Sequence, residues 1–386
     1  MSRPTIVIAG GGTGGHVFPA VAVAEALQTL ADVEVVFCGT ERGAEARVVP
    51  ARGWRLERLD VVPIKGGGLA GAVRGAAVAA RATWKAFGLV RALKPRAVLS
   101  VGGYAAGPVA LAAALLGVPL AVLEPNSVVG LANRLLAPFA RRAYLAWDEA
   151  GAPFRAGVRR TFGVPLRRGF APQPYVPGRT ARVLIMGGSQ GAAALNERMP
   201  GAIARLGSKV QGLEVIHQAG RGRDEDVRGR YASLGVAGVT VVAFIEDTAR
   251  AIAEADLVVA RAGAGTLAEL TAIGRASLLV PFPFAADDHQ ARNAQALARA
   301  GGAVCLRQEG ADAVRLSAEI RRLLEDDAAR VAMADASRAV GRPNATRDVA
   351  ADLLALAAVP ERGMGKRNGA GGVPLLASRV GAGGPS

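Results

Sequence analysis

The stretch Ile8–Ala20, IAGGGTGGHVFPA, combines a run of glycines with one histidine, and chemistry is most readily expected there. A strand that leads straight into glycines and then into a helix leaves unpaired backbone N–H groups at the helix N-terminus, where an anion can bind. The missing Cβ atoms let a ligand come close to that backbone. His16 directly follows the last glycine, and its imidazole titrates near neutral pH. The stretch therefore predicts a loop that holds an anionic ligand.

A second glycine loop, Gly187–Gly191, lies in RVLIMGGSQGAAALNERM, which again predicts a strand, a turn and a helix. Two such loops predict two similar domains with a phosphorylated ligand between them. For each loop taken alone, a tight turn that packs a helix on a strand is the alternative. Gly10, Gly12 and Gly15 also have the spacing of a dinucleotide-binding loop, with Glu41 as its ribose partner, but that spacing does not account for the second loop.

Polar side chains in the second half gather after predicted strands. In RAGAGTLAEL, Thr266 and Glu269 stand near the start of a helix, where a carboxylate can accept hydrogen bonds from two ribose hydroxyls. An ordinary acidic residue favoured by the helix dipole is the alternative. In PFPFAADDHQARNA, two prolines favour an extended loop, and such loops after strands carry sites. The polar residues of this loop are Asp287, Asp288, His289, Gln290 and Asn293.

The composition favours an α/β protein of two domains. The chain has 386 residues, of which 51% are hydrophobic but only 4% aromatic, so Ala, Val and Leu must fill the cores. The net charge of +15 indicates an anionic partner. Nucleic acid is a poor match, because clustered aromatic residues for base stacking are missing. Cys38 and Cys305 lack neighbours at zinc-site spacing, which fits a reducing cytoplasm, and the first residues do not form a signal peptide.

Strands and helices alternate along the chain, which predicts doubly wound parallel sheets. Leu99–Val122 carries no charge and is long enough to span a membrane, but its glycines and prolines favour a buried strand–helix–strand unit. Thr161–Thr180, rich in proline and glycine, predicts an interdomain linker. The other predicted strands are Thr5–Ala9, Val33–Phe37, Leu213–His217, Thr240–Ala243, Leu257–Ala260 and Ser277–Val280, and the other predicted helices are Val17–Leu30, Gly43–Arg52 and Asn344–Ala358.

Five motifs, GGGTGGHVFPA, SVGGYAAGP, GGSQGA, RAGAGTLAE and PFPFAADDHQARNA, occur in an order and spacing that resemble the MurG family of glycosyltransferases, over roughly residues 4–358. The resemblance implies the GT-B fold, in which two Rossmann-like domains face each other across a cleft. It implies an acceptor- and membrane-associated domain over residues 1–162 and a UDP-N-acetylglucosamine domain over residues 163–342. Residues 343–360 are expected to form a closing helix that packs on the first domain, and residues 361–386 a disordered tail.

The function that the resemblance implies is transfer of N-acetylglucosamine, with inversion, from UDP-N-acetylglucosamine to the muramyl 4-hydroxyl of undecaprenyl-pyrophosphoryl-MurNAc-pentapeptide. This step, lipid I to lipid II, belongs to peptidoglycan synthesis, and with it to cell-wall formation, cell shape and cell division. A GT-B enzyme that uses another UDP-sugar or another lipid or small-molecule acceptor is the alternative. A nicotinamide-dependent oxidoreductase is a more distant one.

The resemblance also implies roles for residues that match the motifs. The acceptor diphosphate would lie at Gly10, Gly11, Gly12, Gly102 and Gly103. The donor would be bound by Thr13, Gly14, Gly15, Asn126, Arg167, Ser189, Ile245, Ala264, Gly265, Thr266, Leu267, Glu269, His289 and Gln290. Among these, Arg167 would neutralise charge on the departing UDP, and Glu269 would take the ribose.

The implied reaction needs a base near the acceptor hydroxyl. His16 is the favoured base. The alternative is that His16, at the helix terminus, only donates a hydrogen bond to a phosphate. Tyr104 and Glu124 are the reserve catalytic candidates, and His217 is expected to be structural. Where the family commonly has His-Glu-Gln-Asn, this chain has Leu123-Glu124-Pro125-Asn126, so acceptor binding around this loop is expected to differ in detail.

No cofactor and no metal are expected. Asp224-Glu225-Asp226 formally contains a D-x-D motif, but it lies in a charged run typical of a solvated helix face or loop. In Pro63–Pro95, apolar residues such as Trp84 and Phe87 alternate with basic ones such as Lys65 and Arg81, which suits an anionic membrane surface, with a helix packed on the sheet as the alternative. The expected location is therefore the cytoplasmic face of the inner membrane, as a peripheral protein, with cell-wall synthesis proteins as further partners.

Overall fold

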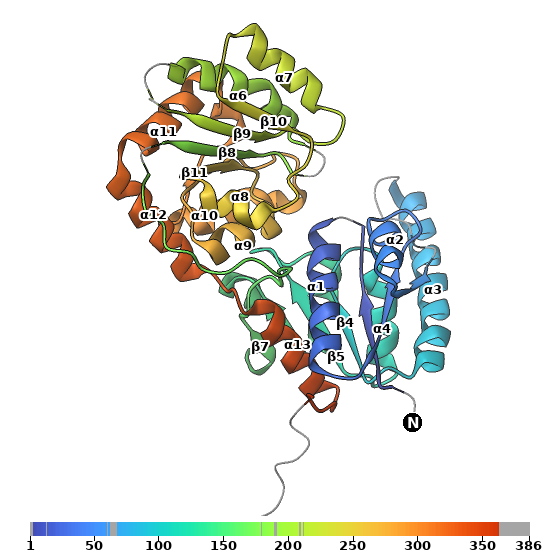
Figure 1. Ribbon diagram of the computed structural model, residues 1–386. Coiled ribbons are helices and arrows are strands. Elements are labelled where there is room, and N and C mark those ends of the chain that lie inside the picture. The colour runs from blue at the N-terminus through green and yellow to red at the C-terminus, as the bar shows by residue number, and fades with distance from the viewer. Residues whose placement is uncertain are drawn as a thin grey trace, which may run out of the picture.

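In the computed structural model, two bodies are each built on a parallel β-sheet (Figure 1). The structure describes residues 3–12, 14–59, 61, 68–178, 180–188, 191–207, 210 and 212–362, with the backbone alone for residues 68–79. The first sheet has the strand order β3-β2-β1-β4-β5-β6-β7, and the second has the order β10-β9-β8-β11-β12-β13. Each order reverses beside the first strand of its sheet, which is the pattern of doubly wound nucleotide-binding domains. The predicted fold class is confirmed.

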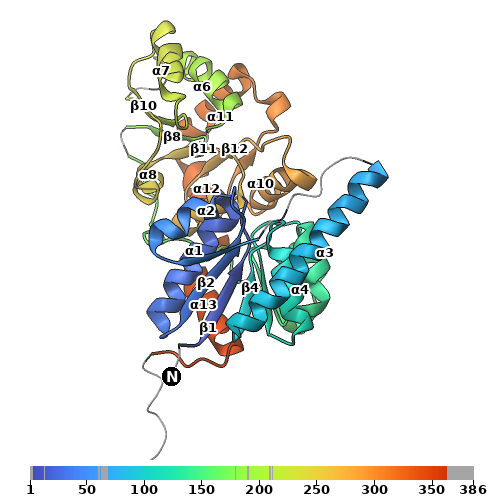
Figure 2. The same cartoon turned by 90° about the vertical axis from the view of Figure 1, so that its right-hand side faces the viewer.

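The first sheet consists of β1 (Thr5–Ala9), β2 (Glu34–Gly39), β3 (Arg55–Arg58), β4 (Ala97–Ser100), β5 (Leu120–Glu124), β6 (Arg142–Leu145) and β7 (Arg159–Arg160). Its helices are α1 (Gly14–Leu30), α2 (Glu45–Val48), α3 (Gly68–Leu93), α4 (Ala106–Leu115) and α5 (Leu131–Leu136). Helices α1 and α2 pack on one face, and α3, α4 and α5 lie on the other, as Figure 2 shows for α1, α3 and α4. The predicted helix over Gly43–Arg52 is split at Pro50, which begins a short 3₁₀ turn.

The second sheet consists of β8 (Arg182–Met186), β9 (Glu214–Gln218), β10 (Val239–Val242), β11 (Leu257–Ala260), β12 (Ser277–Leu279) and β13 (Val304–Cys305). Its helices are α6 (Ala193–Leu206), α7 (Asp224–Ser233), α8 (Thr248–Glu254), α9 (Ala264–Ile273), α10 (His289–Arg299), α11 (Ala313–Glu325) and α12 (Asp327–Val340). Helices α6, α7 and α11 bury apolar side chains against one face, and α8, α9 and α10 against the other.

The uncharged segment Leu99–Val122 folds as predicted, with the end of β4, helix α4 and most of β5 in one buried unit. Helix α4 is rich in alanine, and Ala106, Ala110 and Ala113 are fully buried in it, so the segment is apolar because it lies in the core. Among the described residues, no helix has both the length and the apolar character needed to cross a membrane.

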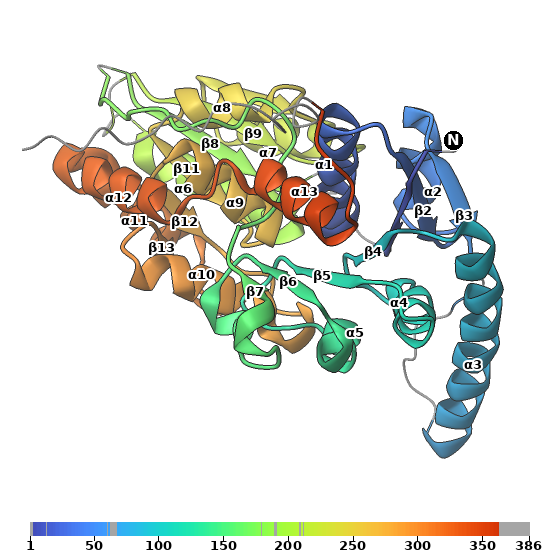
Figure 3. The ribbon, with the colours of Figure 1, turned by 90° about the horizontal axis from the view of Figure 1, so that it is seen from below.

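The last described helix, α13 (Ala345–Leu356), returns from the second body to the first and lies beside α1 (Figure 3). Val349 and Leu353 are fully buried in the core that α1 and the first sheet form. Asp352 of α13 accepts hydrogen bonds from Arg142 Nε and from the Tyr144 hydroxyl, both at 2.9 Å. Apolar burial and a charge-assisted contact to β6 therefore fix α13 on the first body.

Candidate active site between the two sheets

The glycine loop after β1 is held in place by a buried carboxylate. Glu45, at the start of α2, accepts hydrogen bonds from Gly12 N at 2.8 Å, Thr40 N at 2.9 Å and Thr40 Oγ1 at 2.8 Å. A Cβ on Gly11 would lie 2.2 Å from the Glu45 carboxyl carbon, so only glycine fits there. Sequence reasoning considered the exposed Glu41 and missed Glu45. The acidic residue that opens a helix just after β2 is the signal that could have indicated it.

Two amides of this loop are already paired inside the protein. Gly12 N donates to Glu45, and Gly10 N donates to Cys38 O at 3.0 Å. Gly10 and Gly12 have φ values of 146° and 97°, which favour glycine. These two glycines therefore set the shape of the loop. The backbone amides in the first turn of α1 are better able to donate hydrogen bonds to an anion. Thr13, predicted for this loop, lies outside the described residues.

The glycine turn after β4 packs directly on this first loop. A Cβ on Gly103 would lie 2.5 Å from Gly11 O, and one on Gly102 would lie 3.3 Å from His16 Nε2. Tyr104 follows at the loop surface and is 37% exposed. The structure thus brings together the predicted glycines of both loops, with the His16 ring beside the Gly102 backbone.

His16 is half-buried at the first turn of α1. Burial lowers the pKa of His16, the charge of His289 lowers it further, and the Glu45 carboxylate opposes both. At neutral pH the imidazole is therefore neutral, which is the form that can accept a proton. His289 belongs to α10, so the second body contributes to the electrostatic environment of His16.

Glu124, at the end of β5, uses both carboxylate oxygens to hold the loop that follows. Oε1 accepts from Asn126 N at 3.1 Å and Asn126 Nδ2 at 3.2 Å, while Oε2 accepts from Gly130 N and Asn133 Nδ2, both at 3.0 Å. Burial raises the pKa of Glu124, and these hydrogen bonds oppose the shift. Since Pro125 has no N–H to donate, the carboxylate reaches past it to Asn126. Glu124 is thus built to position the loop.

This loop meets the second body through Asn293 of α10, which is fully buried. Asn293 Oδ1 accepts from Ser127 N at 2.9 Å, and Asn293 Nδ2 donates to Asn126 Oδ1 at 3.3 Å. Asn293 lies one helical turn after His289, so α10 presents both side chains toward the first body. Asn293 stood in the predicted polar loop but was not selected as a site residue.

Glu269 and Arg167 form the charged part of the second body's site. Glu269 lies on α9, is half-buried, and makes no hydrogen bond with the described part of the chain. Burial raises the pKa of Glu269 to about 7, and the positive charge of Arg167 opposes that rise. Arg167 Nη2 donates to Thr248 Oγ1 at 2.9 Å, and its guanidinium lies 5.6 Å from the Phe170 ring centre. The Glu269 carboxylate therefore keeps unused capacity to accept hydrogen bonds.

The glycine loop after β8 is as tightly packed as the first. A Cβ on Gly191 would lie 2.0 Å from Ala219 O, and one on Gly187 would lie 2.9 Å from Gln218 O. Ser189, predicted to bind the donor diphosphate, lies outside the described residues. His217, at the end of β9, is fully buried between Tyr231 OH at 3.0 Å and Asn196 Oδ1 at 3.2 Å, and burial lowers its pKa to about 4. His217 is structural, as predicted.

The segment from β12 to α10 has a strained turn. Asp287 and Asp288 have φ values of 52° and 53°, a region that costs free energy for residues other than glycine and that is common at functional sites. His289 Nδ1 contacts Ala286 O at 2.8 Å, and Gln290 Oε1 accepts from Phe282 N at 3.0 Å. The Gln290 amide nitrogen and His289 Nε2 make no hydrogen bond with the described residues.

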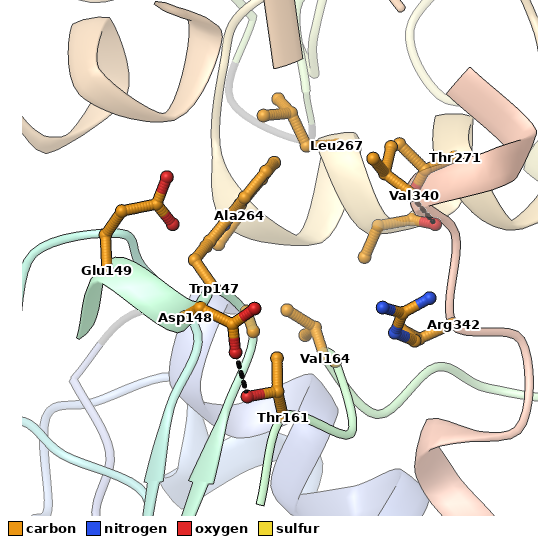
Figure 4. A pocket seen from close by; sticks show the side chains of 13 residues that line it. Trp147, Asp148, Glu149, Thr161, Val164, Ala264, Leu267, Thr271, Val340 and Arg342 are labelled. Carbon is orange, nitrogen blue, oxygen red and sulfur yellow. Dashed lines mark hydrogen bonds between the residues drawn. The ribbon is translucent and has the colours of Figure 1, made fainter. Parts of the chain in front are cut away.

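A cavity of about 140 Å³ lies where α9 begins beside the first body (Figure 4). Trp147, Asp148 and Thr161 line it from the first body, and Asp148 Oδ1 accepts a hydrogen bond from Thr161 Oγ1 at 2.5 Å. Ala264 and Leu267 line it from the second. Leu267 is 2% exposed and packs in the core, so this predicted donor residue can offer a ligand little beyond its backbone. Ala264, Gly265 and Thr266 form the first turn of α9, and Ile245, 9% exposed, precedes α8.

Among the described residues, no group of three or more His, Cys, Asp or Glu side chains is arranged to hold a metal ion. Asp224, Glu225 and Asp226 form the first turn of α7. Asp224 pairs with Arg228 at 3.4 Å, and Asp226 pairs with Arg230 at 3.0 Å. This acidic run is therefore the solvated helix face that its charge pattern predicted.

Comparison with known proteins agrees with the two-body arrangement. Residues 6–145 match the glycosyltransferase family 28 N-terminal domain, and residues 182–351 match the family 28 C-terminal domain. A protein of Sorangium cellulosum is 55% identical over 92% of this chain and 89% of its own length, and one of Myxococcus xanthus is 42% identical over 90% and 93%. Both are named UDP-N-acetylglucosamine–N-acetylmuramyl-(pentapeptide) pyrophosphoryl-undecaprenol N-acetylglucosamine transferase.

Solved structures give the same picture. The crystal structure of Acinetobacter baumannii MurG has a TM-score of 0.74 and 34% identity, covering 91% of this chain and 99% of that one. The UDP-GlcNAc 2-epimerase of Neisseria meningitidis, at 14% identity over 92% of this chain and 100% of its own, has a TM-score of 0.64 and shares the fold. The chain belongs to glycosyltransferase family 28 and, within it, to the MurG family.

Proposed function

We propose that this protein transfers N-acetylglucosamine from UDP-N-acetylglucosamine to the muramyl 4-hydroxyl of undecaprenyl-pyrophosphoryl-MurNAc-pentapeptide, converting lipid I into lipid II. Relatives up to 55% identical carry the name of this transferase. The structural observation that carries the proposal is the hydrogen-bonded contact of Asn126 and Ser127 with Asn293, because it joins the predicted acceptor side to the predicted donor side at one point.

On the donor side, the open Glu269 carboxylate would accept hydrogen bonds from the two ribose hydroxyls. Arg167, held by Thr248, would neutralise the diphosphate as UDP leaves, together with amides of the glycine loop after β8. The first turn of α9 (Ala264, Gly265, Thr266 and Leu267), the backbone of Ile245 and the side chains of His289 and Gln290 would complete the donor site. Thr13 and Ser189 stay in the proposal as residues of the two glycine loops.

On the acceptor side, the first-turn amides of α1 would bind the lipid-linked diphosphate, with Gly102 and Gly103 allowing its close approach. The neutral His16 imidazole would take the proton from the muramyl hydroxyl as that oxygen attacks the anomeric carbon. The bond from the anomeric carbon to the UDP oxygen breaks on the opposite side, so the configuration inverts. Glu124 would act through Asn126 by fixing the loop, and Tyr104 would border the acceptor. No step requires a metal.

Exposed apolar side chains support a membrane-facing surface on the first body. Helices α3, α4 and α5 lie on the same face of the first sheet, where Trp84 is 82% exposed, Leu131 67% and Leu135 67%. Arg81, Lys85 and Arg91 flank Trp84 on α3. Apolar groups with basic neighbours suit an anionic lipid surface, where an undecaprenyl acceptor resides, so we place the protein at the cytoplasmic face of the inner membrane. Lys65, predicted for this surface, lies outside the described residues.

The domain division that we propose assigns residues 1–162 to the acceptor, 163–342 to the donor and 343–360 to the closing helix. The predicted disordered tail falls almost wholly outside the described residues. Involvement in cell shape and division, and contacts with other cell-wall proteins, would follow from the reaction.

The test is radiolabelled transfer from UDP-N-acetylglucosamine to a muramyl-pentapeptide acceptor with a short prenyl diphosphate. Disaccharide formation is expected with this donor and not with UDP-glucose. Equal transfer from both donors would contradict the sugar assignment, and absence of transfer from any UDP-sugar would contradict the function.

A further inference from the structure

A second cavity between the two bodies, of about 550 Å³, is lined by three arginines. Arg134 reaches it from α5 of the first body, and Arg292 and Arg299 reach it from α10 of the second. Gln295 of α10 and Glu149 of the first body also line it, and Glu149 is the residue on the left of the neighbouring cavity in Figure 4. We call it the arginine cavity.

Helix α10 presents a polar stripe to this cavity. Gln295 and Arg299 lie three and seven residues after Arg292, so the three side chains share one helix face. Asn293 points from the neighbouring face into its buried contact with Asn126. The contact that joins the bodies therefore also sets the position of the arginine cavity.

The cavity has little negative charge to pair with its three arginines, which are exposed to solvent. Glu149 is its one lining carboxylate among the described residues, and it lies 4.0 Å from Arg299, at the limit of an ion pair. Arg134 donates to Val129 O at 3.2 Å, a neutral acceptor. Arg292 makes no hydrogen bond or ion pair with any described residue. Guanidinium groups in this arrangement favour a carboxylate or phosphate ligand.

The cavity begins beside the predicted reaction centre. Ser127 lines it, and the same residue donates its backbone N–H to Asn293 next to Asn126. In a muramyl sugar the lactyl group that carries the peptide is on the carbon adjacent to the 4-hydroxyl. The peptide must therefore leave the site within a few ångströms of the reacting oxygen, and a peptide ends in a carboxylate.

We infer that the arginine cavity binds a carboxylate of the acceptor's peptide, with Arg134 contributed by one body and Arg292 and Arg299 by the other; this rests on the proposed function. The ligand bridges both bodies, so peptide binding also favours their approach. Arg292, Gln295 and Arg299 are then specificity residues for the peptide part of the acceptor.

The test compares two acceptor analogues, one with free peptide carboxylates and one with those carboxylates amidated. For R292Q and for R299Q, the KM of the free-carboxylate acceptor is expected to rise roughly tenfold each, the cost of one charge-assisted hydrogen bond. The KM of the amidated acceptor and that of UDP-N-acetylglucosamine stay unchanged. R321Q, which alters an exposed arginine of α11 paired with Glu325, is the matched control.

Equal increases in KM for both acceptors would overturn the inference, because the arginines would then recognise a group that the two acceptors share and not the peptide carboxylates. Unchanged KM values in both variants would also overturn it. Equilibrium binding of the two analogues to the full chain separates this inference from the function. If the wild type binds the free-carboxylate analogue more tightly and R292Q loses that preference, the cavity assignment is supported even without turnover. Transfer without that preference supports the function and rejects the cavity assignment.

Discussion

The carboxylates of Glu45 and Glu124 in the first body and that of Glu269 in the second differ in how many hydrogen bonds they accept from the protein. Glu45 and Glu124 are almost fully buried and accept three and four hydrogen bonds from neighbouring backbone and side chains. Glu269 is half-buried, lacks hydrogen bonds with the described residues, and has a pKa raised to about 7. The first body thus uses these two acids to fix loops, whereas the second leaves Glu269 without a hydrogen bond from the described residues.

This difference assigns different consequences to similar substitutions. Changes in the first body should reduce stability or turnover, because its acids hold the loops around His16 and Asn126. Changes at Glu269 should reduce affinity for the nucleotide and leave the fold intact. Four predictions test the contrast, beginning with the largest effect.

Replacing His16 by alanine should lower kcat by about 10²–10⁴-fold, the usual contribution of a general base, while the Kd for UDP changes little. Steady-state rates together with calorimetric UDP binding measure both values. Because burial and the charge of His289 lower the pKa of His16, the wild-type rate should fall only when the pH drops below that lowered pKa. A rise in the Kd for UDP at unchanged kcat would instead make His16 a phosphate-binding residue.

Replacing Glu45 by alanine should lower the free energy of unfolding by about 3 kcal/mol or more, since three donors, two of them buried, lose their acceptor at about 1–3 kcal/mol each. Denaturant unfolding followed by tryptophan fluorescence, to which Trp54 of the first body contributes, reports this change. Glu269→Ala is the matched control and should shift the unfolding midpoint little. Equal destabilisation by the two substitutions would remove the contrast.

Replacing Glu269 by alanine should weaken UDP binding roughly 10–100-fold, because two hydrogen bonds to a charged acceptor are lost. Isothermal calorimetry measures the affinity, and 2′,3′-dideoxyuridine diphosphate, which lacks the ribose hydroxyls, should bind wild type and variant alike. If the variant bound UDP as tightly as the wild type, the carboxylate would not be the ribose partner.

The smallest expected effect is a pH dependence of uridine binding that arises from Glu269. The folded-state pKa of Glu269 is raised, so ionisation is unfavourable in the ligand-free fold and stability is lost as pH rises through about 7. Ribose hydroxyls favour the ionised form, so uridine, which has no titrating phosphate, should bind more tightly at pH 8 than at pH 6. Glu269→Gln should remove this dependence. NMR titration at the two pH values measures it, and a persistent dependence in the variant would point to another group.

Local sequence patterns predicted the two sheets well, because glycine loops and apolar runs act within a few residues of one another. They missed β3, β6, β7 and β13. All four are short and the first three contain arginine, so their strand conformation depends on neighbouring strands. Among the residues of the candidate site, His16 was predicted from the sequence, because the glycine loop itself sets its position. The roles of Glu45 and Asn293 depend on which distant backbone groups the fold brings to them, and local spacing carries no such information.

The return of α13 to the first body affects how the chain matures during synthesis. The first sheet ends at Arg160, yet Val349 and Leu353, which complete its core, emerge from the ribosome roughly 190 residues later. At about 5–20 residues per second this delay is on the order of ten seconds or more. Throughout that interval the amino-terminal half lacks the apolar side chains of α13 that cover it beside α1, so we expect it to be prone to association until α13 docks.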